Sequence, residues 1–114
     1  MVIYNVTVNI EEVSEKEWLH WMQTEHIPEM LELDMFLKAK LTKVRVQEEL
    51  GGTTYSIQYT ANNQEGLDSY YKNHADVLRS KSNKFAGKFV AFRTELEVIG
   101  EYVKESQRSS TPKL

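Results

Sequence analysis

Apolar and polar residues alternate strictly at the start of the chain, over residues 2–10. The apolar positions of this stretch are Val2, Tyr4, Val6, Val8 and Ile10. Strict alternation is typical of a strand with one buried face. Similar patterns predict strands over residues 53–61 and 88–99. Residues 36–49 alternate less perfectly, which predicts a long strand containing a bulge.

Helical spacing replaces alternation after the first strand. Ser14 followed by Glu17 matches a capping box, which predicts a helix running to about His26. Since the residue before a proline is biased away from helical geometry, Pro28 predicts a break and then a short turn over residues 29–33. One stripe of this helix holds Trp18, Leu19, Trp21, Met22, Glu25 and His26, with His20 on the opposite side.

A second amphipathic helix follows the strand over residues 53–61, and either Asn62 or Asn63 is its expected N-cap. Its apolar stripe consists of Leu67, Tyr70, Tyr71, His74, Ala75 and Leu78. Gly51 and Gly52 mark a hairpin between the two strands that precede it.

The resulting order, β-α-β-β-α-β, predicts an α+β fold of the ferredoxin-like type. Because crossovers are right-handed, both helices should cover one face of a four-stranded antiparallel sheet. We expect residues 1–100 to form a single domain and residues 101–114 to form a polar C-terminal tail.

The strand patterns also predict a polar sheet face. Its expected members are Asn5, Thr7, Asn9, Ser56, Gln58, Thr60, Arg93, Glu95 and Glu97. One interpretation is a solvated face, as antiparallel sheets often have. The other is that two sheets meet across a two-fold axis and form a dimeric α/β barrel. The long second and fourth strands favour the barrel, as do Ile3, Phe89 and Ala91, which are expected to be exposed on that side.

Composition excludes several functions. The net charge of the 114 residues is −3, so a basic surface for nucleic acid or anionic membrane is not expected. The chain has no cysteine, and its three histidines lack metal-ligand spacing, so we expect neither a metal nor another cofactor. No apolar run is long enough to span a membrane, and no signal peptide is visible, which leaves the cytoplasm as the expected compartment.

His26 is the main candidate for chemistry, because an imidazole titrates near neutral pH and this one lies in an apolar stripe. The alternative is structural: the imidazole would hydrogen-bond carbonyls freed where the helix ends. Glu25 is a weaker candidate, and His74 is interpreted as a core or interface histidine. Arg93 and Glu95 either orient a polar ligand or fix the register of a dimer.

Several motifs resemble those of known proteins. Trp18-x-x-Trp21-x4-His26-x-Pro28 is similar to the aromatic-then-histidine-proline signature of the ethyl tert-butyl ether degradation (EthD-like) proteins, small members of the dimeric α/β-barrel superfamily. Residues 2–99 resemble more closely an uncharacterised bacterial family of that superfamily. The segments that carry this resemblance are Ile3-Tyr4-Asn5-Val6-Thr7, His26-Ile27-Pro28-Glu29, Gly51-Gly52-Thr53-Thr54-Tyr55-Ser56 and Phe92-Arg93-Thr94-Glu95-Leu96-Glu97.

The superfamily includes cofactor-independent monooxygenases, haem-degrading proteins, chlorite dismutases and muconolactone isomerases. The haem-degrading members use an Asn, a Trp and a His, and this chain has Asn5, Trp18 and His26. Its histidine, however, is expected at the end of the first helix rather than on the second, so the haem site is not transferred. Resemblance of fold alone is a weak argument for chemistry.

Two hypotheses follow. In the first, a homodimeric barrel binds or transforms a small organic molecule between the first helix and the sheet. His26 is then the acid/base, Trp18 and Trp21 are the walls, and Asn5 and Arg93 are polar anchors. The chemistry would be proton abstraction or cofactor-free oxygenation, since no activated nucleophile is visible. In the second, the chain is a non-catalytic ligand-binding or assembly module in which these residues are structural.

Overall fold

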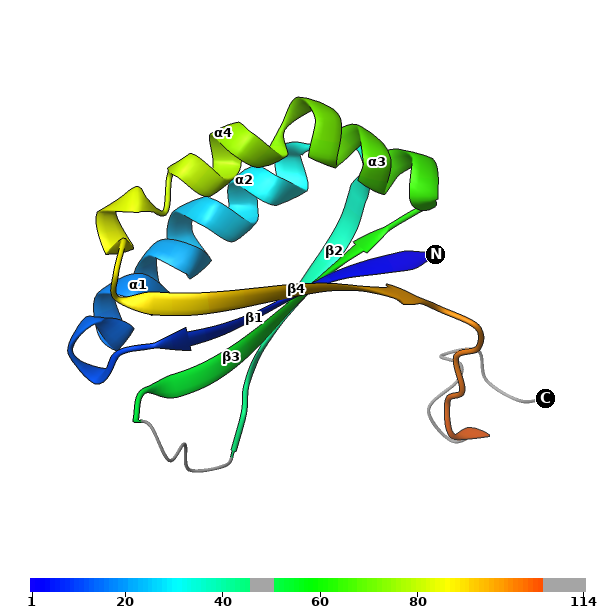
Figure 1. Ribbon diagram of the computed structural model, residues 1–114. Helices are drawn as coiled ribbons and strands as arrows, with labels where there is room; N and C mark the ends of the chain where they lie inside the picture. The colour runs from blue at the N-terminus through cyan, green and yellow to red at the C-terminus, as the bar shows by residue number, and fades with distance from the viewer. Residues whose placement is uncertain (46–50, 106–114) are drawn as a thin grey trace.

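A four-stranded antiparallel sheet forms the base of the computed structural model, which describes residues 1–45 and 51–105 (Figure 1). Its strands are β1 (Val2–Ile10), β2 (Phe36–Lys43), β3 (Thr53–Ala61) and β4 (Phe89–Glu97). They lie in the order β2-β3-β1-β4, and every neighbouring pair is antiparallel. Figure 1 shows all of the helices on one face of the sheet. The predicted α+β, ferredoxin-like fold is confirmed.

The second strand contains the predicted irregularity. Its pairing with β3 shifts register between Phe36 and Lys38, which is the signature of a β-bulge. The strand ends at Lys43, earlier than expected, and residues 46–49 of the predicted strand lie outside the described residues. The same is true of positions 106–114 of the predicted tail.

The first helical segment differs from the prediction at both ends. It consists of α1 (Glu15–Trp21), a π-helical stretch (Met22–His26) and α2 (Ile27–Glu32), which follow one another without a break. Ser14 is not a capping box residue, because its hydroxyl donates to Glu11 Oε1 (2.7 Å) and caps no backbone amide.

The predicted break at Pro28 is also wrong, since Ile27 has helical dihedral angles (φ −61°, ψ −46°). A proline within an α-helix has no N–H to donate, and its ring clashes with the carbonyl four residues earlier. Widening the helix just before Pro28 relieves this clash, and the Ile27 N–H donates to the carbonyl of Met22, five residues back. The extra residue per turn changes the direction of the side chains that precede Pro28.

The second helical segment is divided in two, α3 (Gln64–Asn73) and α4 (Ala75–Ser80). His74 lies at the break with a non-helical backbone (φ −132°, ψ −29°) and is half-buried. Figure 1 shows α3 and α4 following one another across the face of the sheet. His74 therefore lies between two helices, and the prediction that it belongs to the stripe of a single helix is wrong.

Of the two asparagines that could cap α3, Asn63 does so: its Oδ1 accepts a hydrogen bond from the Gly66 N–H (2.8 Å). We predict that Asn63→Ala lowers the free energy of unfolding by about 1 kcal/mol, because one amide of the first turn loses its partner. Asn62→Ala is the matched control and should change stability less. Chemical denaturation of both variants measures the difference, and equal losses would contradict the assignment of the cap.

The faces of β4 are the main correction to the predicted sheet. Val6 is opposite Arg93 and Tyr4 is opposite Glu95, so Arg93 and Glu95 lie on the face that the helices cover. They do not belong to the open polar face, and neither does Glu97, which is opposite Val2. Phe89 and Ala91, expected to be exposed, are half-buried against the core.

The open face of the sheet is therefore more apolar along β4 than predicted. Val90, Phe92 and Leu96 lie on it, and their exposed fractions are 57%, 67% and 40%. Beside them, Asn5 donates to Thr94 Oγ1 (3.2 Å) and accepts from the Ser56 hydroxyl (2.7 Å). The open face thus combines an apolar edge with a polar centre.

The hydrophobic core lies between the sheet and the helices. Its largest fully buried side chains are Trp18, Tyr4, Tyr59, Tyr70, Phe85, Ile10, Met30, Ile57 and Leu67. Many of these are aromatic, and several carry a polar atom that must be satisfied inside the fold. Within the described part of the chain, no helix is both long and apolar enough to cross a membrane.

Candidate functional site

A small cavity lies within the core, between the sheet and the helical layer. Its lining residues are Tyr4, Val6, Val8, Trp18, Trp21, Met22, His26, Met30, Ile57, Tyr59, Tyr70, Arg79, Ser82, Phe89, Ala91 and Arg93. Its free volume is about 50 Å³, which is space for a few water molecules. Four of the five predicted site residues, His26, Trp18, Trp21 and Arg93, line it.

His26 enters this cavity from the last position of the π-helical stretch. Its ring stacks on that of Trp21, with centroids 4.8 Å apart and planes inclined by 21°. Its Nδ1 atom is buried and has no hydrogen-bond partner among the described residues. The structural alternative, in which this nitrogen bonds a carbonyl at a helix end, therefore does not hold for Nδ1. The helix does not end there, since α2 continues from Ile27.

The surroundings of His26 favour the neutral imidazole. Burial lowers the pKa of His26 from 6.5 to about 4. Glu29 raises this pKa, whereas the cations Lys81 and Arg93 lower it further. At neutral pH the ring is uncharged, so it presents a polar group to the cavity without a charge.

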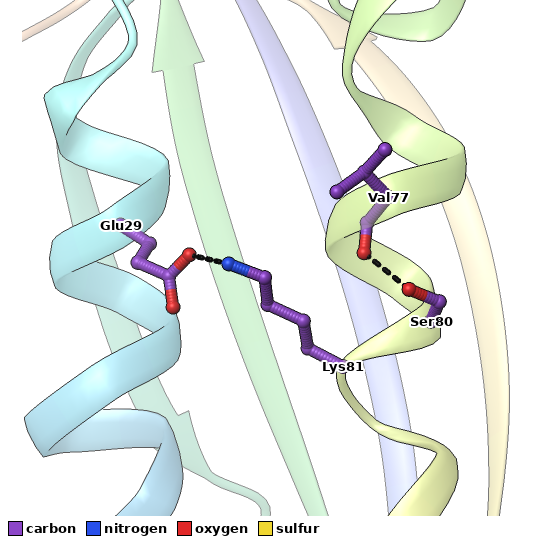
Figure 2. A network of polar contacts seen from close by, with 4 residues as sticks. All are labelled: Glu29, Val77, Ser80 and Lys81. Atoms are coloured by element: carbon purple, nitrogen blue, oxygen red, sulfur yellow. Dashed lines mark hydrogen bonds and ion pairs between the residues drawn. The ribbon is translucent and has the colours of Figure 1, made fainter.

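A bridge between α2 and the end of α4 holds these charges in place. The Lys81 ammonium donates to Glu29 Oε2, and Figure 2 shows the two side chains spanning the space between their helices. Next to this bridge, the Ser80 hydroxyl donates to the carbonyl of Val77 (2.6 Å). The Glu29–Lys81 pair is partly exposed, so it contributes little to stability but keeps a cation and an anion near His26.

Two other acidic or cationic groups lie close to the aromatic wall. Lys84 Nζ is 5.0 Å from the ring centroid of Trp21, within the range of a cation–π contact. Glu25 is exposed, and its carboxylate lies 3.8 Å from the same ammonium. Glu25 does not line the cavity, which agrees with its secondary rank in the sequence.

Arg93 and Asn5 were both predicted to be polar anchors, and the structure separates them. Arg93 reaches the cavity from β4, one of the two edge strands, and is exposed, unlike the other residues that line the cavity. Arg93 is thus the lining residue that solvent reaches most readily. Asn5 points to the open face of the sheet and does not line the cavity, so its expected role beside His26 is wrong in geometry.

The sequence did not single out Arg79, which lies on α4 and is half-buried in the cavity wall. Its Nη2 donates to the Tyr4 hydroxyl (2.9 Å), while its Nε is buried without a partner among the described residues. Ala75, Leu78, Arg79 and Ser82 follow the spacing i, i+3, i+4 and i+7. This spacing predicts one helical face, so the signal for Arg79 was present.

The cavity does not fulfil either sequence-based hypothesis completely. Its free volume is well below the ~300 Å³ at the lower end for ligand sites, so an organic molecule enters only if side chains move. Yet the cavity is not a fully satisfied core either, since His26 Nδ1 and Arg79 Nε both lack partners among the described residues. In the same part of the chain, no group of three His, Cys, Asp or Glu side chains is placed to hold a metal ion.

Solved structures with the same fold come from bacteria and a marine sample. An EthD family protein from Bacillus halodurans is 15% identical with a TM-score of 0.64, covering 87% of this chain and 100% of its own. A dimeric ferredoxin-like protein from an uncultured marine organism is 11% identical with a TM-score of 0.68, covering 89% and 97%. SnoaB, a cofactor-independent oxygenase from Streptomyces nogalater, is 5% identical with a TM-score of 0.65, covering 90% and 97%.

At these identities the likeness establishes the fold and not the activity. No curated protein is significantly similar to the chain in sequence. A family model does match, over residues 1–99, and thus includes all four strands, the helices and every residue that lines the cavity. The chain therefore belongs to the family described as Domain of unknown function (DUF4286).

Proposed function

We propose that this protein binds a small organic molecule in the cavity beside His26, and that it does so as a homodimer. The observation that carries the proposal is a buried imidazole nitrogen without a partner, in a cavity walled by aromatic rings. Burying a polar atom unpaired costs free energy, so such an atom in a folded protein requires an explanation, and service to a ligand or a reaction is one. Trp18 and Trp21 supply the apolar surface that an organic ligand needs.

The polar groups are suited to acid/base chemistry without a cofactor. His26 is neutral, and its Nδ1 would exchange a proton with the ligand during proton abstraction or oxygenation. A pKa of about 4 is too low for an efficient base at neutral pH, so a catalytic step requires a ligand that raises it. The oxygenase activity of SnoaB supports this chemistry by analogy of fold only.

The homodimer rests on a different surface, the open face of the sheet. Phe92 and Val90 are more than half exposed there, next to Leu96, and no helix of the described chain covers them. Exposed apolar residues grouped on one face are typical of a protein interface. The marine protein of the same fold is described as dimeric, which supports a dimer here by analogy of fold.

The alternative function is a non-catalytic binding or assembly module. The observation that favours it is the small volume of the cavity, about 50 Å³. The experiment below distinguishes a binding module from an assembly module, because only a binding module responds to an added ligand.

Benzoate and benzamide, two aromatic molecules of nearly equal size, test the proposal. The chain has two tryptophans, Trp18 and Trp21, and both line the cavity. A 1H–15N NMR spectrum of the protein therefore has two indole N–H signals, and both report on the cavity. We predict that titration with at least one of the two molecules shifts both signals at low millimolar concentration, where a fragment of this size binds.

Ala91→Ile should abolish the shifts, because the larger side chain extends into the cavity from β4. Val77→Ile, an exposed position on α4, is the matched control. If neither molecule shifts the indole signals of the wild type, or if Ala91→Ile leaves the shifts unchanged, the cavity is not a binding site.

A further inference from the structure

The charges around the cavity point to a narrower class of ligand. Arg79 and Arg93 both line it, and none of its described lining residues is an aspartate or glutamate. The ion pairs among the described residues join lysines to glutamates, and neither arginine takes part in one. A guanidinium is always protonated at physiological pH, so two positive charges face one cavity without a counter-charge.

The nearest carboxylate on the same face of β4 is engaged elsewhere. Glu95 accepts hydrogen bonds from the Tyr71 hydroxyl (3.1 Å) and from Gln64 Nε2 (3.0 Å). The carboxylate of Glu95 is therefore hydrogen-bonded to side chains of α3 and not to Arg93, although Glu95 and Arg93 are only two residues apart in sequence. Glu29, the other nearby acid, is bound to Lys81.

Both arginines act on the same region of the cavity wall. The positive charges of Arg79 and Arg93 both lower the pKa of the Tyr70 hydroxyl, although burial outweighs them and the pKa of Tyr70 stays above its ordinary value. The pKa of Tyr59 is raised by its own burial and by Tyr70 and Tyr4. These hydroxyls therefore remain protonated at physiological pH and add no negative charge to the cavity wall.

Arg79 also has a donor to spare. Its Nη2 donates to Tyr4, which fixes the guanidinium, while the buried Nε–H has no partner. A guanidinium binds a carboxylate through two parallel N–H groups, and such paired bonds are among the strongest in proteins. The fixed orientation reduces the entropy lost on binding.

We propose, building on the binding function above, that the ligand is a small aromatic or apolar organic acid whose carboxylate lies between Arg79 and Arg93. Its apolar part lies against Trp18 and Trp21, and the exposed guanidinium of Arg93 contacts its carboxylate from the solvent side. A bound carboxylate also places a negative charge near His26, which stabilises the imidazolium and makes the ring a better proton acceptor. An acidic ligand would therefore raise the pKa of His26, as the proposed acid/base chemistry requires.

The charge of the probe tests this inference separately from binding itself. Wild-type protein should bind benzoate at least about tenfold more tightly than benzamide, as judged from the two indole signals. Arg79→Met should reduce benzoate affinity to the level of benzamide while leaving benzamide affinity nearly unchanged. Arg93→Met, at an exposed position, should act in the same direction if Arg79→Met does not fold.

Lys84→Met is the matched control, because it removes a positive charge next to Trp21 from outside the cavity. It should leave the ratio of the two affinities unchanged. If benzoate and benzamide bind equally well, the acid preference is wrong and the binding function stands. If Lys84→Met lowers the ratio as much as the arginine variants do, the preference reflects general charge and not this site. If neither molecule binds, both proposals fail.

Discussion

Phe92→Glu is expected to convert the proposed homodimer into a monomer at micromolar concentration. Phe92 is the most exposed of the three apolar residues that β4 presents on the open face, with 67% of its surface accessible. It is opposite Thr7 of β1 in the sheet, so it lies in the middle of its strand rather than at an end. In a sheet-to-sheet dimer its ring would be buried, and a glutamate in its place would be an unpaired buried charge.

The expected effect is large because a two-fold interface contains each residue twice. Loss of a central aromatic residue from an interface costs about 2 kcal/mol or more. Two copies together correspond to about 4 kcal/mol, which is roughly a thousandfold increase in the dissociation constant of the dimer. A dimer of nanomolar affinity would then dissociate in the micromolar range.

Sedimentation equilibrium over a range of concentrations measures this change. Val77→Glu is the matched control, since Val77 is a similarly exposed apolar residue (63%) on α4, on the other side of the molecule. It should leave the dimer intact. A wild-type protein that sediments as a monomer at micromolar concentration, or a Phe92→Glu variant that remains dimeric, would contradict the barrel.

The fold itself could be predicted because strand alternation and helical spacing are local signals. The pattern over residues 2–10 and 53–61 has one polar face and one apolar face, and both strands were placed to the residue. The fourth strand was different, since it has apolar residues on both faces. Which face packs against the helices depends on the register with β1, and a strand that is apolar on both faces specifies this register only weakly. Arg93 was therefore assigned to the wrong side of the sheet.

The helices show a second limit of local reasoning. Pro28 is a strong local signal for a break, but the chain absorbs it with a π-helical stretch that keeps the helix continuous. At His74 the reverse occurs: a regular apolar stripe predicted one helix, and the structure has two. Both features alter which way side chains point, and both adjoin histidines. Tertiary packing overrides local preference at these positions.

The candidate site was only partly accessible to sequence reasoning. His26, Trp18 and Trp21 could be grouped because they share one helix. Arg79 could not be connected to Arg93, since one lies on a helix and the other on an edge strand, and only the packing of these two elements places both at the cavity. The absence of a carboxylate from the cavity is likewise a property of three dimensions, because 17 acidic residues occur in the chain.

Acidification should destabilise the protein through His26. The pKa of this group is about 4 in the folded chain, because of burial and the nearby cations Lys81 and Arg93, with Glu29 opposing them, whereas its ordinary pKa is 6.5. Between these two values the unfolded chain carries a proton on His26 and the folded chain does not. The unfolded state therefore binds more protons, and stability falls as the pH decreases from about 6.5 to about 4. Below that range the folded ring is protonated too, and this contribution no longer changes.

The full loss corresponds to up to about 3 kcal/mol, since one pKa unit is equivalent to ~1.36 kcal/mol. Urea denaturation at pH 7 and pH 4 measures it, and carboxylates that titrate in the same range are removed by comparison with His26→Gln. That variant should lose less stability than the wild type on acidification, while His20→Gln, which removes an exposed imidazole from the same helix, provides the reference. Parallel profiles for the wild type and His26→Gln would mean that the imidazole is already solvated, and the site would then lack the buried neutral ring on which its proposed chemistry depends. A profile that flattens when benzoate is added would instead link the two proposals, because a carboxylate bound beside Arg93 offsets the cost of charging His26.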